Sequence, residues 1–150
     1  MNFKEKISEY FGIEENKYRI GTITAFLVLI TLLAWQSDDA YHAYVMARHL
    51  VEGNGFVYNI GERVSASSCP LFTLIVALGY FIIRNMFVVS LLICVSFSTI
   101  AYCIVVNSFC RTKKEIIFTF ITLIGCISFM SYTTAGLENC LLFLLSAIFL

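Results

Sequence analysis

Three stretches of this chain contain no Asp, Glu, Lys, Arg or His and are long enough to cross a lipid bilayer. They are residues 20–37, 85–110 and 116–132. A helix needs about 20 mostly apolar residues to span the hydrocarbon core. The mean hydropathy of +0.85 and the 59% of hydrophobic residues are typical of the same class. We therefore predict an all-α membrane protein built as a multi-span transmembrane helix bundle.

Two shorter apolar runs complete this pattern. Residues 141–150 resemble the start of a fourth span, so we expect the chain to be the N-terminal part, 20–150, of a longer transmembrane domain. Residues 70–83 are short for a span and are predicted to form an interfacial or re-entrant helix, with a short crossing as the alternative. If they do not cross, seven of the ten Lys and Arg lie inside, whereas a crossing gives five on each side. The positive-inside rule favours the first topology.

The polar segments are expected to flank these spans. Residues 1–19 mix acids and bases with apolar residues near helical spacing, which predicts a cytoplasmic amphipathic helix on the membrane, or else a short solvated tail. Residues 38–69 form the predicted outer loop. Within it, a juxtamembrane helix should begin near Asp38 and stop at Gly53-Asn54-Gly55, and Phe56 to Val64 should form a short hairpin.

Charge and cysteine spacing exclude several function classes. The formal net charge is zero and Lys and Arg form no basic stripe, which argues against a nucleic-acid partner. The cysteines show no Cys-x-x-Cys or Cys/His ligand spacing, so no structural metal site is indicated. Cys94, Cys103, Cys110 and Cys126 are interpreted as apolar packing residues, and a disulfide between Cys69 and Cys140 is left open.

Asp38 and Asp39 are the main candidates for chemistry. They stand where the first apolar run ends. Carboxylates at the end of a span are costly to desolvate, and this makes them a functional-site hypothesis. The alternative is a helix N-cap, in which a carboxylate accepts hydrogen bonds from the first backbone N–H groups. If residues 70–83 do not cross, Glu138 reaches the same outer face, and three carboxylates can converge.

An ordered series of motifs extends this hypothesis over most of residues 35–145. The series is Asp38-Asp39-Ala40-Tyr41, Ala47-Arg48-His49-Leu50, Glu52-Gly53-Asn54-Gly55-Phe56-Val57-Tyr58-Asn59, Gly61-Glu62-Arg63-Val64, Pro70-Leu71-Phe72 and Gly136-Leu137-Glu138. It resembles the polytopic GT-C glycosyltransferases that use polyprenyl-phosphate sugars, and is similar to bacterial terminal arabinofuranosyltransferase-like and mannosyltransferase-like membrane proteins. The chain departs from the family pattern at Ile60 and at Asn139-Cys140, where prolines are common.

The resemblance implies a hexosyl- or pentosyltransferase in the bacterial cytoplasmic membrane, with its active site on the outer face. The donor would be a polyprenyl-phosphate sugar, and the acceptor a cell-envelope glycan, lipid or protein. Transfer would be inverting, with Asp38 as the general base that takes a proton from the acceptor hydroxyl. Asp39 would orient the acceptor or contact a metal, and the two roles could be reversed.

The other candidate residues each carry two interpretations. Arg48 could bind the lipid phosphate or could be an interfacial arginine whose head reaches water. Arg63 shares these interpretations, and structural pairing with Glu62 is favoured. Glu138 could orient substrate or, with Asp39, ligate a divalent cation, against simple pairing with a helix dipole. Tyr41 could stack on a sugar, although tyrosine is common at membrane interfaces.

Two rival functions remain open at this point. A cation-coupled transporter or channel could use the same three acids, but such proteins typically carry ionisable residues or broken helices at mid-membrane. A non-catalytic membrane scaffold of the same fold is the other alternative.

Overall fold

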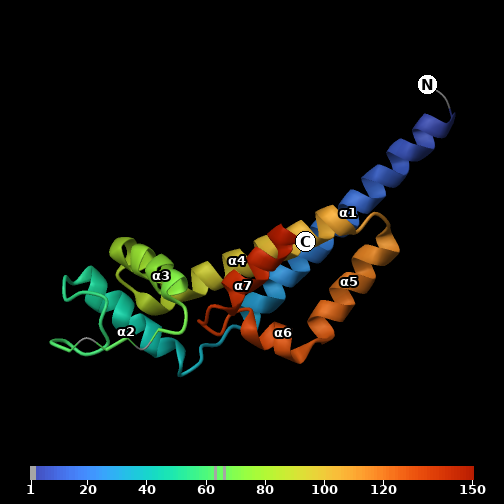
Figure 1. Ribbon diagram of the computed structural model, residues 1–150. Coiled ribbons are helices and arrows are strands. Elements are labelled where there is room, and N and C mark those ends of the chain that lie inside the picture. The colour runs from blue at the N-terminus through green and yellow to red at the C-terminus, as the bar shows by residue number, and fades with distance from the viewer. Residues whose placement is uncertain (1–2, 63, 66) are drawn as a thin grey trace.

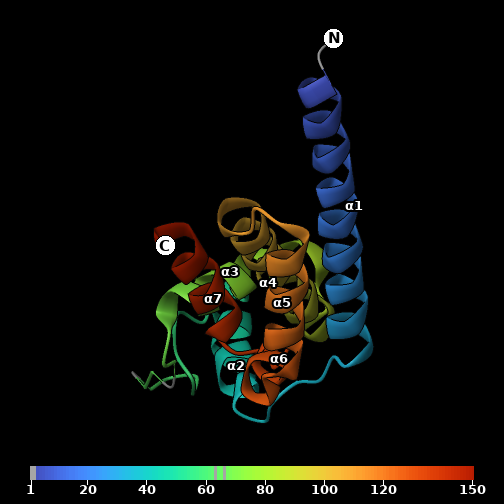
Figure 2. The ribbon, with the colours of Figure 1, turned by 90° about the vertical axis from the view of Figure 1, so that its right-hand side faces the viewer.

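The computed structural model describes residues 3–62, 64–65 and 67–150. In these residues the chain is all-helical with no strand, which confirms the predicted helical class. Figures 1 and 2 show α1 as a rod whose N-terminal end extends beyond the other helices. The helices are α1 (Phe3–Leu32), α2 (Ala40–Val51), α3 (Pro70–Ile83), α4 (Met86–Phe109), α5 (Lys113–Gly125), α6 (Ile127–Tyr132) and α7 (Asn139–Phe149).

Helix α4 contributes residues to two separate apolar clusters, one toward each of its ends. Figure 1 shows α2 and α3 near one end of α4, and α1 and α5 toward the other. The α2-side cluster joins the N-terminal part of α4 to α2, α3 and α7. Its buried members are Ala40, Tyr44, Ala47, Phe72, Val76, Ala77, Val89, Cys94, Cys140 and Leu141. The α1-side cluster joins the C-terminal part of α4 to α1 and α5. Its buried members are Phe26, Ile30, Tyr102, Val106, Cys110 and Ile116.

Helix α4 corresponds closely to the predicted span 85–110. Asn85 starts it by accepting a hydrogen bond from the Val88 N–H, at 3.1 Å. Within the described residues, α4 is the one helix whose length and apolar composition would let it cross a membrane. Helices α3 and α7 are apolar but shorter. The helix predicted at 70–83 is present with those bounds, and Pro70 occupies its first turn, where no N–H is needed.

A single helix, α1, covers most of the predicted N-terminal segment (1–19) and the first part of the predicted span 20–37, and it ends before that span does. Helix α1 is continuous from Phe3 to Leu32, and residues 34–37 are not helical. The chain leaves the helix early because tertiary hydrogen bonds replace helical ones. The backbone N–H of Ser37 donates to the Ala135 carbonyl at 2.9 Å, and the Trp35 indole N–H donates to the Ser131 carbonyl at 2.8 Å.

The predicted span 116–132 is also not one helix. It is divided into α5 and α6 at Cys126, whose extended backbone (φ −82°, ψ 97°) interrupts the helical path. The Cys126 N–H still bonds back to the Thr122 carbonyl at 3.2 Å, so α5 ends with a completed turn before the chain changes direction. The start of α5 is fixed by a reciprocal capping box between Thr112 and Glu115.

The outer loop contains the predicted helix but not the predicted hairpin. Helix α2 ends at Val51, and Gly53 and Gly55 have positive φ, as the Gly-Asn-Gly stop signal requires. In the described part of residues 56–64 no strand forms. A hydrogen bond from the Tyr58 N–H to the Val64 carbonyl, at 2.8 Å, closes the loop. A turn at Asn59–Glu62 and the left-handed Gly61 leave too little extended chain for a ladder.

Candidate functional site

Asp38 and Asp39 lie in the turn that leads into α2, and both residues are exposed. Asp39 occupies the N-cap position, but its backbone is helical (φ −63°, ψ −26°) and its side chain makes no capping hydrogen bond. The turn is instead held by main-chain bonds, from the Tyr41 N–H to the Asp38 carbonyl and from the His42 N–H to the Asp39 carbonyl. Among the described residues neither carboxylate has a hydrogen bond or ion pair, so both can accept a proton or a ligand.

The segment 133–138 lies directly beside this acidic turn. The backbone N–H of Ser37 donates to the Ala135 carbonyl, and the backbone N–H of Trp35 donates to Thr134 Oγ1 at 3.4 Å. Residues 133–136 are buried. The fold therefore brings two segments about a hundred residues apart in sequence to one place.

Gly136 makes this approach sterically feasible. Its φ is +78°, a region that side chains disfavour, and an added Cβ would collide with Tyr44 Oη and would lie 3.0 Å from Ala40 Cβ. Helix α2 can therefore pack against the 133–138 segment only because position 136 has no side chain.

Glu138 follows at the start of α7, where it is partly exposed. Its Oε1 accepts a hydrogen bond from Ser68 Oγ at 2.9 Å, and the side chain does not cap the helix. The contact ties Glu138 to the end of the outer loop. Glu138 is thus anchored, whereas Asp38 and Asp39 are not.

Tyr44 is a buried residue in the first half of α2, the helix that the acidic turn leads into. It is 5% exposed, and its hydroxyl donates to Ser90 Oγ of α4. Burial raises the pKa of the Tyr44 phenol above its ordinary value, so the hydroxyl stays protonated and remains a donor. The exposed ring of Tyr41 meets Tyr44 edge-on, with ring centroids 5.5 Å apart.

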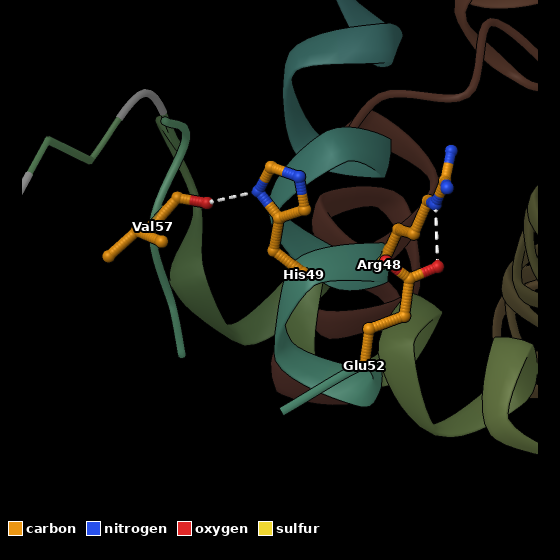
Figure 3. Close-up of polar contacts among 4 residues, drawn as sticks. All are labelled: Arg48, His49, Glu52 and Val57. Atoms are coloured by element: carbon orange, nitrogen blue, oxygen red, sulfur yellow. Dashed lines mark hydrogen bonds and ion pairs between the residues drawn. The ribbon is translucent and has the colours of Figure 1, made fainter. Parts of the chain in front are cut away.

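Arg48 lies one turn further along α2 than Tyr44. Its Nε donates to Glu52 Oε1 at 2.7 Å, and this hydrogen bond raises the pKa of the exposed guanidinium (Figure 3). On the opposite side of the helix in the same view, His49 Nδ1 contacts the Val57 carbonyl at 3.0 Å. That contact fastens the outer loop to α2. Arg63 lies outside the described residues.

A cavity of about 460 Å³ opens between α2 and the junction of α3 and α4. Gln36 and Tyr41, which bracket the acidic pair in sequence, both line it. Its remaining lining residues are Tyr44, Val45, Arg48, Tyr80, Arg84, Asn85, Met86 and Phe87. The cavity therefore combines two arginines and three tyrosines with an apolar wall.

Arg84 is a charged lining residue that the sequence analysis did not select as a candidate. It ends α3 in the left-handed conformation (φ 56°, ψ 18°), and its guanidinium lies 5.7 Å from the ring centroids of both Tyr80 and Phe81. A lone arginine after an apolar run is the sequence signal that could have indicated it. Its proximity to Arg48 depends on how α2 packs against α3.

No group of three or more His, Cys, Asp and Glu side chains in the described residues is arranged to hold a metal ion. The assignment of Asp39 and Glu138 as cation ligands stays a prediction. The chain matches no protein-family model, and no curated protein or solved structure is significantly similar to it.

Proposed function

We propose that this chain works as part of a membrane glycosyltransferase that moves a sugar from a polyprenyl-phosphate carrier to a cell-envelope glycan, lipid or protein acceptor. The multi-span topology and the position on the outer face of a bacterial cytoplasmic membrane belong to the same proposal. The motif series from Asp38 to Glu138 supports it from the sequence.

The observation that carries the proposal is the pair of partner-free carboxylates in a turn bracketed by two cavity residues, Gln36 and Tyr41. A carboxylate without a protein partner keeps its lone pairs for the proton of an acceptor hydroxyl. Asp38 takes this proton as the hydroxyl oxygen attacks the anomeric carbon, and the bond to the carrier phosphate breaks with its electron pair on the phosphate oxygen. Asp39 orients the acceptor, and the two roles are interchangeable.

The phosphate leaves with its negative charge and needs cationic stabilisation more than a proton. Arg48 supplies a guanidinium in the cavity, and this group is charged at any physiological pH. The exposed ring of Tyr41 offers a stacking surface for a sugar. Glu138, which Ser68 holds at the end of the outer loop, orients the substrate.

The test is the surface-glycan mass profile of cells that carry the wild-type protein, Asp38→Asn or Asp39→Asn, with protein abundance measured in each. We expect loss of one defined sugar increment, because general-base removal costs about 10²- to 10⁴-fold in rate. Glu15→Gln is the matched control, since it removes a carboxylate from α1, on a different element. An unchanged profile in both Asp variants, against a changed profile when the protein is absent, would contradict the enzyme proposal and favour the non-catalytic scaffold.

A further inference from the structure

We propose that Cys94 and Cys140 form an intramolecular disulfide that links α4 to α7 inside the α2-side cluster. The pairing concerns a covalent bond of the fold, and it holds whether or not the carboxylates transfer a sugar. It differs from the pairing that the sequence left open, in which Cys140 joins Cys69.

The first support is the contact between the two sulfurs. Both cysteines are free and fully buried in this structure, and the Cys140 thiol donates to Cys94 Sγ at 3.4 Å. A disulfide bond is about 2.05 Å long, so the sulfurs need to come only about 1.4 Å closer, which rotations about the two Cα–Cβ bonds can supply. Among the described residues, only this pair of cysteines has a hydrogen-bonded contact between sulfurs.

The second support is the set of contacts on either side of Cys94. Ser90, Cys94 and Ser98 recur at four-residue spacing and therefore share one face of α4. The two serines are hydrogen-bonded to the Tyr44 hydroxyl and to the Thr133 carbonyl. Because these buried hydrogen bonds fix how the neighbouring segments meet α4, the sulfur of Cys94 stays within reach of its partner.

The bond closes a long loop. Cys94 and Cys140 lie 46 positions apart in the sequence. A cross-link over such a distance removes much of the conformational freedom of the unfolded chain and stabilises the folded state. It also fixes the start of α7, and with it the segment 133–138 that packs beside the acidic turn.

The bond forms by thiol–disulfide exchange with a disulfide oxidant, such as oxidised glutathione or the disulfide of an oxidoreductase. The thiolate of one cysteine attacks a sulfur of the oxidant, and the second oxidant sulfur leaves as a thiolate. The thiolate of the other cysteine then attacks the mixed disulfide and releases the first oxidant sulfur. The chain loses two electrons and two protons, and the oxidant gains them as two thiols.

Burial and compartment decide when and where this exchange takes place. Both sulfurs are buried once α7 has packed on α4, so exchange precedes that packing. Disulfides persist in the oxidising space outside the cytoplasmic membrane. On the compartment alone, the inference rests on the proposed function, which places segment 133–138 on the outer face.

Peptide mass spectrometry of the full chain tests the pairing. Cells that express the protein are quenched in acid, free thiols are alkylated with N-ethylmaleimide under denaturing conditions, and the digest is analysed without reduction. We expect a cross-linked peptide that contains Cys94 and Cys140, together with alkylated Cys103. A cross-link between Cys69 and Cys140 would overturn the pairing.

A second sample separates the pairing from the topology. The purified chain is reduced and unfolded, and is then diluted into mild detergent with oxidised glutathione, so that the oxidant reaches every thiol. A Cys94–Cys140 cross-link in this sample but not in cells supports the pairing and contradicts the outer-face position. Free thiols at both positions in both samples would refute the pairing. Asp38→Asn should keep the cross-link, so failure of the transferase proposal is read separately.

Thermal unfolding in detergent links the bond to the fold. The melting temperature of the wild type should be about 10 °C higher without dithiothreitol than with it, because reduction reopens the loop. Cys94→Ala should abolish this difference. Cys103→Ala, which removes a thiol from the same helix, should keep it. If Cys94→Ala fails to fold, Cys140→Ser replaces it, and a difference that persists in the variant of either paired cysteine would refute the assignment.

Discussion

The two clusters on α4 differ in the kinds of side chain that they contain. In the α1-side cluster the contacts are between large apolar side chains, with Phe26 stacked on Tyr102 at 4.6 Å between ring centroids. In the α2-side cluster small residues such as Ala40 let the backbones approach, and polar groups are buried. In this cluster the Tyr44 hydroxyl donates a hydrogen bond to Ser90 Oγ. Further along α4, Ser98 Oγ donates to the Thr133 carbonyl at 3.0 Å.

The difference between the clusters indicates which part of the fold tolerates only one arrangement of its side chains. Apolar packing tolerates small shifts, but a buried hydroxyl must meet one particular partner or lose its hydrogen bond. The Tyr44–Ser90 and Ser98–Thr133 hydrogen bonds both lie at segment 133–138, which packs against the acidic turn. We infer that the α2-side cluster positions the candidate site, and that the α1-side cluster mainly stabilises the bundle.

The largest expected effect is at Gly136. Gly136→Ala should destabilise the protein by about 4 kcal/mol, because a Cβ there meets Tyr44 and because φ is +78°. Gly21→Ala in α1 is the matched control, since its Cβ meets nothing within 4 Å. It should stabilise by about 0.5–1 kcal/mol. Thermal unfolding in detergent, followed by Trp35 fluorescence, measures both, and equal melting temperatures would contradict the tight approach at Gly136.

The next effect tests the α1-side cluster. Phe26→Ala should cost about 3 kcal/mol, because Phe26 is fully buried and the stacked ring of Tyr102 cannot fill the space it leaves. Lipid tails are as apolar as the lost ring, so the cost is mainly unmade packing. The proposed transfer activity of the variant molecules that still fold should be nearly unchanged. A selective loss of activity would mean that this cluster also positions the site.

A single substitution made in both clusters sharpens the comparison. Tyr44→Phe removes the donor to the buried Ser90 hydroxyl and should cost about 1–2 kcal/mol. Tyr102→Phe removes a buried hydroxyl that has no well-formed hydrogen bond within the described residues and only Thr22 as a near polar side chain, so it should be close to neutral. The same unfolding measurement compares them. Equal effects at the two tyrosines would refute the division into a polar and an apolar cluster.

The sequence allowed prediction of those elements whose signals are local. Pro70 and the charge of Arg84 bracket α3, and the charge-free run at 85–110 predicts α4. The early end of α1 could not be predicted, because Ser37 bonds to Ala135, which is distant in sequence. The break at Cys126 likewise lies inside an uninterrupted apolar run.

The candidate site divides in the same way. Asp38, Asp39 and Arg48 could be selected because their motifs are contiguous in sequence. Arg84 was not selected, because its local signal is only a lone charge after an apolar run, and its place in the same cavity as Arg48 follows from the packing of α2 on α3. The hairpin prediction failed because the left-handed Gly61 and the Asn59–Glu62 turn take up the chain that a ladder would need.

The last expected effect is a small gain in stability at Arg84. Arg84→Gly should stabilise the protein by about 1 kcal/mol, because glycine adopts the left-handed conformation at little cost. The gain is small because the lost contacts of the guanidinium with Tyr80 and Phe81 offset part of it. Chemical unfolding of Arg84→Gly and Arg84→Lys, which keeps the strain and the charge, separates the two contributions. Higher stability of Arg84→Gly would show that the strain of the left-handed backbone outweighs the ring contacts of the guanidinium, whereas lower stability would show that Arg84 is structural.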